Sequence, residues 1–292
     1  MLASQSPMIL REALKQGGGE LRAANVPSPV LAAELLLMHV VGASRAWLYA
    51  HADDPLDAGA AERYGELIRR RSAGTPTQYL TGHQEFWGLE FEVTPDVLIP
   101  RPETEHVMEV AIGRLGKERS REPLRVADVG TGSGCLAVAL ARELPAARIF
   151  ATDVSPRALA VARRNAARHG VAERIAFVES DLLAAFLPRS LDLVVSNPPY
   201  IGRKEAASLP REVREHEPAE ALFGGEEGME AYPTLIAEAA ERLIASGVLV
   251  VELGYEVSER VEALLDTADW RDIAITNDLA GIPRVLSAVR IE

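Results

Sequence analysis

The spacing of apolar residues divides the chain into a helical first part and a mixed second part. Over residues 1–73, apolar side chains recur every three or four positions, which is the period of an amphipathic helix. Breaks are expected at Gly17–Gly19, at Pro27–Pro29 and at Asp53–Pro55, because glycine and proline interrupt helices. The pattern therefore predicts a small N-terminal helical bundle.

Residues 74–100 follow a different pattern, in which aromatic and apolar side chains alternate around Gly88. Such alternation is typical of a β-hairpin, and we expect this segment to link two domains. A helix should begin after Pro102. Proline suits the first turn of a helix, and the carboxylates of Glu103 and Glu105 suit its positive end.

Residues 101–292 alternate apolar strands with amphipathic helices. This alternation predicts an α/β domain, a parallel sheet whose ligands bind at the carboxyl ends of the strands. Seven strands are expected, at 124–130, 148–154, 174–180, 191–197, 248–254, 272–277 and 285–291.

The composition is that of an ordinary globular protein, with 48% hydrophobic and 25% charged residues in a chain of 292. No apolar run reaches bilayer length, and the first residues contain no continuous apolar core, so we expect neither a membrane span nor a signal peptide. The single cysteine, Cys135, excludes an internal disulfide and a multi-cysteine zinc site. We expect a cytoplasmic protein.

The net charge of -12 disfavours a nucleic-acid partner, because such proteins carry clustered Lys and Arg against the phosphates. A protein substrate is favoured instead. The basic run Arg69–Arg71 is more typical of a solvated helix end than of a binding face.

A glycine-rich turn, Gly130, Thr131, Gly132, Ser133 and Gly134, follows the first strand of the α/β domain. Its glycines allow the backbone to turn sharply and approach a ligand, and the next helix offers free N–H groups. The spacing G-x-G-x-G differs from the dinucleotide pattern G-x-G-x-x-G, which argues against NAD. A tight turn without a ligand is the alternative.

The next two strands end in acidic residues. Asp153 stands where a carboxylate can accept both hydroxyls of a ribose, although it can also serve as the N-cap of the helix near Pro156. Asp181 can accept a hydrogen bond from an adenine amine, or it can cap the turn before Leu182. The two acids favour a nucleoside ligand.

The most informative segment is Ser196–Tyr200, with the sequence S-N-P-P-Y, directly after an apolar strand. Two prolines fix the backbone, so the side-chain oxygen of Asn197 and the carbonyl of Pro198 can hold one NH2 group. Tyr200 can provide a flat surface for a planar amide or amine. A strand-ending turn is the alternative, because Asn and Pro are common in turns.

These segments together resemble the HemK/PrmC family, the glutamine methyltransferases that act on the GGQ motif of peptide-chain release factors. The resemblance covers nearly the whole chain. It rests on PTQYLTGHQEFWGLEFEV, VLIPRPETE, DVGTGSG, SNPPY, EPAEALFGGEEGMEAY and IPRVLSAVR.

The resemblance implies a seven-stranded, Rossmann-like domain that binds S-adenosylmethionine. Gly130–Gly134 would line the methionine part, Asp153 would hold the ribose, and Asp181 with Leu182 would border the adenine. Many relatives carry an aromatic residue where this chain has Leu182. Asn197, Pro198, Pro199 and Tyr200 would bind the substrate amide. Of these, Asn197, Pro198 and Tyr200 would be catalytic, and Asn197 would also contact the cofactor. Glu103 and Glu105 would border the site.

Two further groups receive simpler interpretations. Glu215, His216 and Glu217 are adjacent and do not converge on one ion, so we expect a solvated loop and no metal. Cys135 stands at a helix start, where a packing role is expected.

The expected activity is methyl transfer from S-adenosylmethionine to the side-chain amide nitrogen of the GGQ glutamine, giving N5-methylglutamine. The partner is a release factor, which the N-terminal bundle would help to dock, and we expect a monomer. Two alternatives remain: an adenine amino-group methyltransferase acting on nucleic acid, and a non-catalytic adaptor. The first predicts a basic groove, and the second predicts no turnover.

Overall fold

The computed structural model describes residues 8–115 and 123–291, and the described chain forms two compact units. We call residues 1–83 with 210–216 the bundle unit, and the rest of the chain, from Gln84 to Leu209 and from Glu217 to Glu292, the sheet unit. No helix in the described ranges is both long and apolar enough to cross a membrane.

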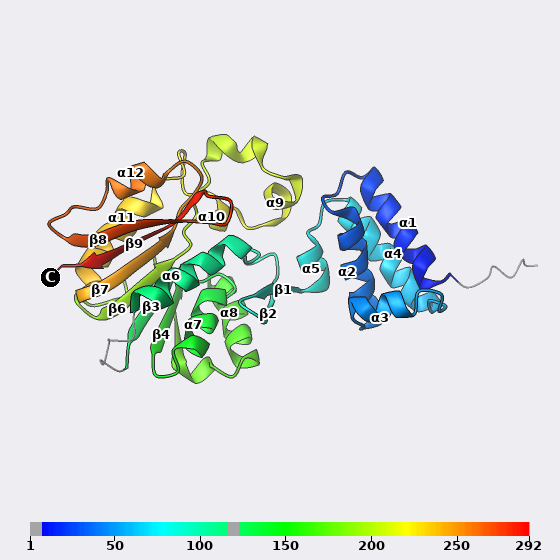
Figure 1. The fold of residues 1–292 in the computed structure, drawn as a ribbon, viewed down its shortest axis with the longest axis horizontal. Coiled ribbons are helices and arrows are strands. Elements are labelled where there is room, and N and C mark those ends of the chain that lie inside the picture. The colour runs from blue at the N-terminus through cyan, green and yellow to red at the C-terminus, as the bar shows by residue number, and fades with distance from the viewer. Residues whose placement is uncertain (1–7, 116–122, 292) are drawn as a thin grey trace, which may run out of the picture. The chain divides into compact units, whose positions relative to one another are not determined.

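The bundle unit is helical, and its core lies between α1, α2 and α4 (Figure 1). Leu21, Leu36 and Leu37 are fully buried in this core. Its helices are α1 (Leu10–Ala23), α2 (Pro29–Val41), α3 (Arg45–Ala50), α4 (Ala58–Ser72), α5 (Thr77–Thr81) and the short α9 (Arg211–His216).

One prediction for the bundle was wrong, and another was right at two of its three residues. Helix α1 continues through Gly17–Gly19, because Gly17 lies against the hydroxyl of Tyr64 and only a residue without a Cβ fits there. Arg69 and Arg70 are exposed in the last turn of α4, as predicted, but Arg71 in the same turn is buried. It is 4% exposed, pairs with Glu212 and donates to the carbonyl of Thr75 at 3.2 Å.

The sheet unit begins with a hairpin of β1 (His83–Phe86) and β2 (Leu89–Glu92), whose first residue still belongs to the bundle unit. Asn165 anchors the second strand. Its side-chain oxygen accepts the N–H of Glu92 at 2.7 Å, and its amide group donates to the carbonyls of Glu92 and Ser133 at 3.0 and 2.8 Å. Glu105 adds a second anchor by accepting the N–H of Trp87 at 2.7 Å.

The centre of the sheet unit is a seven-stranded sheet with the order β5-β4-β3-β6-β7-β9-β8. As predicted, a helix starts after Pro102, first as the 3-10 turn η1 (Pro102–Thr104) and then as α6 (Glu105–Leu115). The strands are β3 (Arg125–Val129), β4 (Arg148–Asp153), β5 (Ile175–Glu179), β6 (Leu191–Ser196), β7 (Leu243–Glu252), β8 (Trp270–Asn277) and β9 (Pro283–Arg290).

Helices cover both faces of this sheet (Figure 1). Successive strand residues point to opposite faces, so Val126 packs on one side and Ala127 on the other. One face carries α6, α7 (Cys135–Glu143) and α8 (Pro156–Arg168), and the other carries α11 (Ala231–Arg242) and α12 (Ser258–Glu262). The short elements η2 (Ala172–Arg174), η3 (Arg203–Ser208) and α10 (Ala219–Leu222) lie in the connections.

The sheet is parallel except for β9, which runs antiparallel to both β7 and β8. The predicted parallel sheet is therefore confirmed for most of its strands, and β9 departs from it. The connection from β8 to β9 is residues 278–282, too short for the crossover that a parallel neighbour requires.

Candidate active site at the carboxyl ends of the strands

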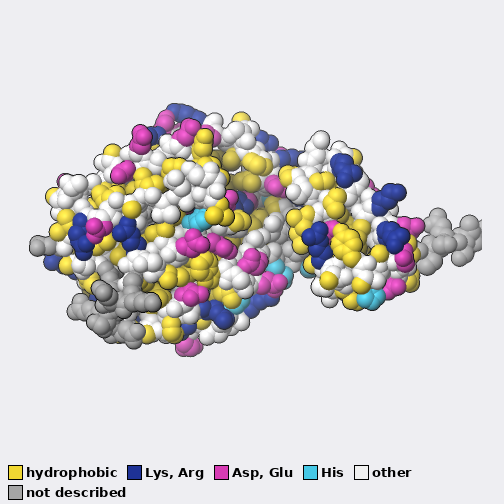
Figure 2. Space-filling model, viewed as in Figure 1, with side chains coloured by type: hydrophobic (Ala, Val, Ile, Leu, Met, Phe, Trp, Pro, Cys, Tyr) yellow, Lys and Arg dark blue, Asp and Glu magenta, His cyan; other side chains and the backbone are white. Residues whose placement is uncertain are grey.

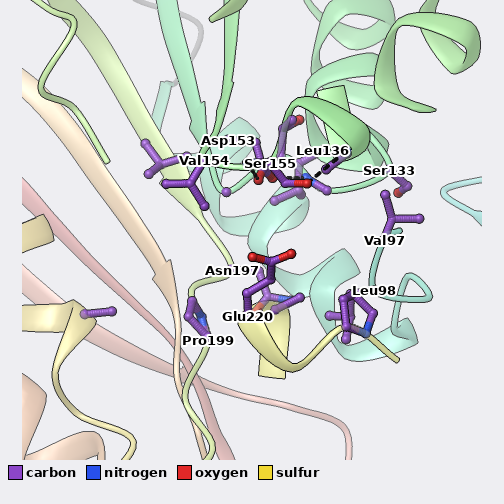
Figure 3. A pocket seen from close by; sticks show the side chains of 18 of the residues that line it. Val97, Leu98, Ser133, Leu136, Asp153, Val154, Ser155, Asn197, Pro199 and Glu220 are labelled. Carbon is purple, nitrogen blue, oxygen red and sulfur yellow. Dashed lines mark hydrogen bonds between the residues drawn. The ribbon is translucent and has the colours of Figure 1, made fainter. Parts of the chain in front are cut away.

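A cavity of about 410 Å³ opens at the carboxyl ends of β3, β4, β5 and β6 (Figure 3). The chain passes from β3 outward to β4 and β5 and then returns to β6 on the other side of β3, which places the cavity at the switch point of the sheet. The cavity volume lies within the roughly 300–1,000 Å³ of small-molecule sites. Predicted site residues in its lining are Gly130, Thr131, Gly132, Ser133, Asp153, Asp181, Leu182, Asn197 and Pro199.

Positive backbone angles shape the glycine turn, with φ of 72° at Gly130 and 54° at Gly132. Such angles favour glycine because it has no Cβ. The N–H groups of Gly130 and Thr131 both donate to the carbonyl of Thr152, at 2.9 and 2.8 Å, so β4 fixes the turn. Gly134 is absent from the lining of the cavity. A Cβ on it would lie 3.0 Å from that of Ala162, so it allows α7 and α8 to pack closely.

Asp128, which was not predicted as a site residue, supports the glycine turn through hydrogen bonds. Its Oδ2 accepts the hydroxyl of Thr131 at 2.6 Å and the N–H of Ala137 at 3.0 Å, while Oδ1 has no hydrogen-bond partner among the described residues. Burial raises the pKa of this carboxyl to about 7. In the sequence, the one sign of this role is that Asp128 is a charged residue within an apolar strand.

Asp153 lies beside the glycine turn and faces the cavity (Figure 3). Its Oδ2 accepts the N–H of Gly132 at 2.9 Å, and its Oδ1 accepts the N–H of Ser155 at 2.9 Å. The N-cap of α8 is Ser155, so the alternative role of Asp153 as that N-cap is wrong. Each carboxylate oxygen has a second lone pair, which leaves capacity for two ligand hydroxyls.

Ser180, Asp181 and Leu182 form the wall after β5. Leu182 has a φ of 44°, a left-handed conformation that is uncommon for a leucine. The carbonyl of Leu182 accepts the hydroxyl of Thr152 at 3.4 Å, and the next N–H, on Leu183, donates to Glu238 at 2.8 Å. The wall is therefore held from both sides, and an apolar side chain lines it.

Asn197 lies in the opposite wall and donates its Nδ2 to the hydroxyl of Thr104 at 3.1 Å. Pro199 lines the cavity, whereas Pro198 and Tyr200 do not. The hydroxyl of Tyr200 points to Glu252 at 3.2 Å, and burial raises its pKa, so the phenol stays protonated. Thr104 and Glu252 were not predicted as site residues, and they lie 148 positions apart in the chain.

A glycine-rich segment, residues 222–230, packs along the Asn197–Tyr200 turn. A Cβ on Gly224 would overlap the carbonyl oxygen of Pro199, and one on Gly228 would overlap the carbonyl oxygen of Tyr200. Glu230 fixes this segment by accepting the N–H groups of Glu226, Glu227 and Met229 at 2.7, 3.1 and 2.8 Å. The segment thus holds the turn by direct backbone contact.

The lining of the cavity is acidic. It includes five carboxylates and neither Lys nor Arg, and Figure 3 shows Asp153 on one side of the space and Asn197 and Glu220 on the other. A cationic ligand is favoured there and a polyphosphate is disfavoured. The five acidic residues are Asp96, Asp153, Asp181, Glu220 and Glu230.

The remaining candidates have structural roles. Glu103 and Glu105 are absent from the lining, and Glu217 is buried, not solvated, because it accepts the N–H of Ile99 at 3.2 Å and the guanidinium of Arg101 at 2.6 Å. Glu215 lies in α9 and pairs with Arg211 at 2.8 Å. In the described ranges, no cluster of three potential metal ligands occurs.

Cys135 begins α7 and touches both the cavity and the core beside it. Burial raises the pKa of its thiol to about 12. The thiol is therefore protonated at neutral pH, and a thiolate nucleophile is disfavoured.

Two family models match the chain, the PrmC N-terminal domain at residues 12–82 and the methyltransferase small domain at residues 112–214. A methyltransferase from Pyrococcus furiosus shares the fold, with a TM-score of 0.53 at 15% identity over 80% of this chain and 100% of that one.

Curated relatives match over nearly their whole length. The release factor glutamine methyltransferase of Koribacter versatilis is 45% identical over 96% of this chain and 98% of the relative. The protein of the same name from Moorella thermoacetica is 43% identical over 98% of this chain and 100% of the relative. The chain therefore belongs to the family of release factor glutamine methyltransferases.

Proposed function

We propose that the protein transfers a methyl group from S-adenosylmethionine to the side-chain amide nitrogen of the glutamine in the GGQ motif of a release factor, giving N5-methylglutamine. Family membership supports the reaction. The observation that carries it is the placement of Asn197. Its carboxamide lines the cavity with Nδ2 turned to Thr104, which leaves the oxygen free to accept a substrate NH2.

The residues of the cavity suit S-adenosylmethionine. Asp153 has lone pairs for ribose hydroxyls, the glycine turn allows close approach of the methionine part, and Leu182 offers apolar surface beside the adenine. The acidic lining suits its cationic sulfonium, which supplies a methyl group to a nucleophile.

Catalysis on this proposal consists of positioning and exclusion of water. An amide nitrogen is a weak nucleophile because its lone pair is delocalised into the carbonyl. Asn197 and the carbonyl of Pro198 would hold its two hydrogens, and the turn that carries them is fixed by two prolines and by Gly224. No side chain has to remove the proton before transfer.

An adenine in nucleic acid fits less well. The cavity lining carries no Lys or Arg, and on the face of the sheet unit drawn in Figure 2 the described basic side chains are interspersed with acidic ones and form no continuous strip. A groove for a phosphate backbone requires such a strip. A cytoplasmic location, a monomeric state, the docking role of the bundle and the linker role of residues 74–100 stay predictions.

The test is mass spectrometry of a bacterial release factor and of a DNA duplex, each incubated with the protein and S-adenosylmethionine. We expect one added methyl on the GGQ glutamine and a loss of about 10²–10³-fold in kcat for Asn197→Ala. Asn277→Ala, at an exposed strand end, serves as the control and should act like the wild type. Methylated DNA with an unmodified release factor would support the rival activity, and no methyl on either would support the adaptor.

A further inference from the structure

A chain of buried hydrogen bonds connects the end of β7 to the Asn197–Tyr200 turn. Glu252, the last residue of β7, is fully buried. Its Oε2 accepts the hydroxyl of Thr104 at 2.7 Å, and its Oε1 accepts the hydroxyl of Tyr200 at 3.2 Å. The hydroxyl of Thr104 in turn accepts Nδ2 of Asn197 at 3.1 Å.

The direction of these bonds follows from the donor inventory. An ionised carboxylate only accepts, so the single hydroxyl hydrogen of Thr104 must point to Glu252. The Thr104 oxygen then has only lone pairs left, and Asn197 must turn its NH2 toward it. The carboxamide oxygen of Asn197 is thereby directed away from Thr104.

We propose that Glu252 is a positioning residue that sets the orientation of the Asn197 carboxamide through Thr104. This inference rests on the proposed function, because the oriented oxygen is the acceptor for the substrate amide. The same carboxylate holds Tyr200, whose ring lies close to Gly254, where an added Cβ would be 3.0 Å from it. One buried charge therefore organises both ends of the N-P-P-Y turn.

The charge of Glu252 determines the direction of these hydrogen bonds. Burial, as the largest cause, raises its pKa to about 7, and nearby Glu103 adds to this, while the hydrogen bonds from Thr104 and Tyr200 and the charge of Arg284 lower it. A protonated Glu252 can donate to Thr104, and the freed hydroxyl hydrogen then lets Asn197 flip. Other titratable groups near the carboxyl are Tyr232 on α11 and Cys135 on α7.

The first test is the pH profile of kcat/KM with a release factor as substrate. The kcat/KM of the wild type should fall as pH drops below 7, by at most about tenfold per pH unit, and level off about 10²-fold lower, where Glu252 is protonated and Asn197 can flip. Glu252→Gln should lose about 10²-fold in kcat/KM at pH 8, and its profile should show no further fall at acid pH (no acid limb). The reason is that its neutral amide can either donate to Thr104 or accept from it, so it does not fix Asn197. Thr104→Val, which lacks the hydroxyl, should behave like Glu252→Gln. Thr104→Ser, which keeps the hydroxyl, should retain the acid limb of the wild type.

Tyr232→Phe is the matched control, since this hydroxyl bonds the backbone carbonyl of Glu252 at 3.1 Å and not the carboxylate. It should keep the acid limb, and both Tyr232→Phe and Glu252→Gln, which change no residue of the cavity lining, should bind S-adenosylhomocysteine as the wild type does. An acid limb in Glu252→Gln equal to that of the wild type would overturn the inference.

A second test needs no substrate. The side-chain amide of Asn197, assigned by its absence in Asn197→Ala, is followed by ¹⁵N NMR between pH 5.5 and 8.5, a range of about 1.5 units on each side of the expected midpoint. Its resonance should titrate in the wild type and stay constant in Glu252→Gln. If no release factor is methylated, the proposed function fails while this titration still decides the inference. A resonance that does not move in the wild type overturns it.

Discussion

Only glycine fits at position 224, because the backbone of Pro199 lies in close contact with it. A Cβ there would overlap the carbonyl oxygen of Pro199 and lie 2.9 Å from the carbonyl carbon. No flexible side chain is involved, so nothing can move aside cheaply. The contact keeps the carbonyls of the Asn197–Tyr200 turn in one orientation, as the proposed hold on the substrate amide requires.

Gly224→Ala should lower kcat by about 10²-fold, because a shift of about 1 Å in the acceptor pair spoils the alignment of the amide. Gly113→Ala, on α6 with no atom near the added Cβ, is the matched control and should gain up to about 1 kcal/mol of helix stability. Steady-state kinetics with a release factor decide the matter. A Gly224→Ala enzyme with wild-type kcat would show that the turn is held by other contacts.

The placement of residues at the cavity was predictable from the sequence where they directly follow or end a strand. Gly130, Asp153 and Asn197 were selected from their places after strands, and all three line the cavity. Thr104 and Glu252 could not be identified from the sequence, because their hydrogen bond joins residues 148 positions apart and forms only in the folded chain. A threonine and a strand-ending glutamate carry no local sign of that contact.

At the scale of elements, α1 shows how a distant partner overrides local propensity. Three successive glycines favour a break, yet the helix runs through them. Gly17 faces α4, where a Cβ would overlap the hydroxyl of Tyr64, while Gly19 has no atom within 4 Å of an added Cβ. The glycines therefore serve different purposes within one helix.

Gly17→Ala should destabilise the bundle by about 1–3 kcal/mol, because overpacking forces α1 and α4 apart. Gly19→Ala should stabilise it by about 0.5–1 kcal/mol, because alanine is the better helix former. Urea unfolding read by hydrogen exchange of peptides from α1 and α4 gives both values. Equal effects of the two substitutions would contradict the packing role of Gly17.

The strands were predicted well because they are apolar runs of ordinary length between turns, as in β6, whose residues are all buried. The direction of β9 was not predicted, because strand orientation depends on the length of the connection and not on the strand's own residues. The hairpin was found from alternation, but its anchorage through Asn165 was not, because a helical asparagine gives no sign of a partner 73 residues away.

At the scale of the whole molecule, two buried carboxyls contribute to how stability depends on pH. Asp128 and Glu252 both have pKa values raised to about 7 by burial, from ordinary values of 3.8 and 4.5. Between the ordinary and the raised value, the folded protein holds protons that the unfolded chain has released. The stability that these two carboxyls contribute therefore falls as pH rises through this window.

The contribution of Asp128 can be isolated with Asp128→Asn, which keeps the shape and can still accept from Thr131 and Ala137. Each pH unit in the window changes the free energy of unfolding by about 1.4 kcal/mol for one group. The wild type should thus lose about 3 kcal/mol relative to the variant between pH 5 and pH 8. Urea unfolding read by hydrogen exchange of peptides from β3 and β6 measures the difference at each pH. A difference that stays constant, or grows in favour of the wild type, would mean that Asp128 is ionised in the folded state well below pH 7.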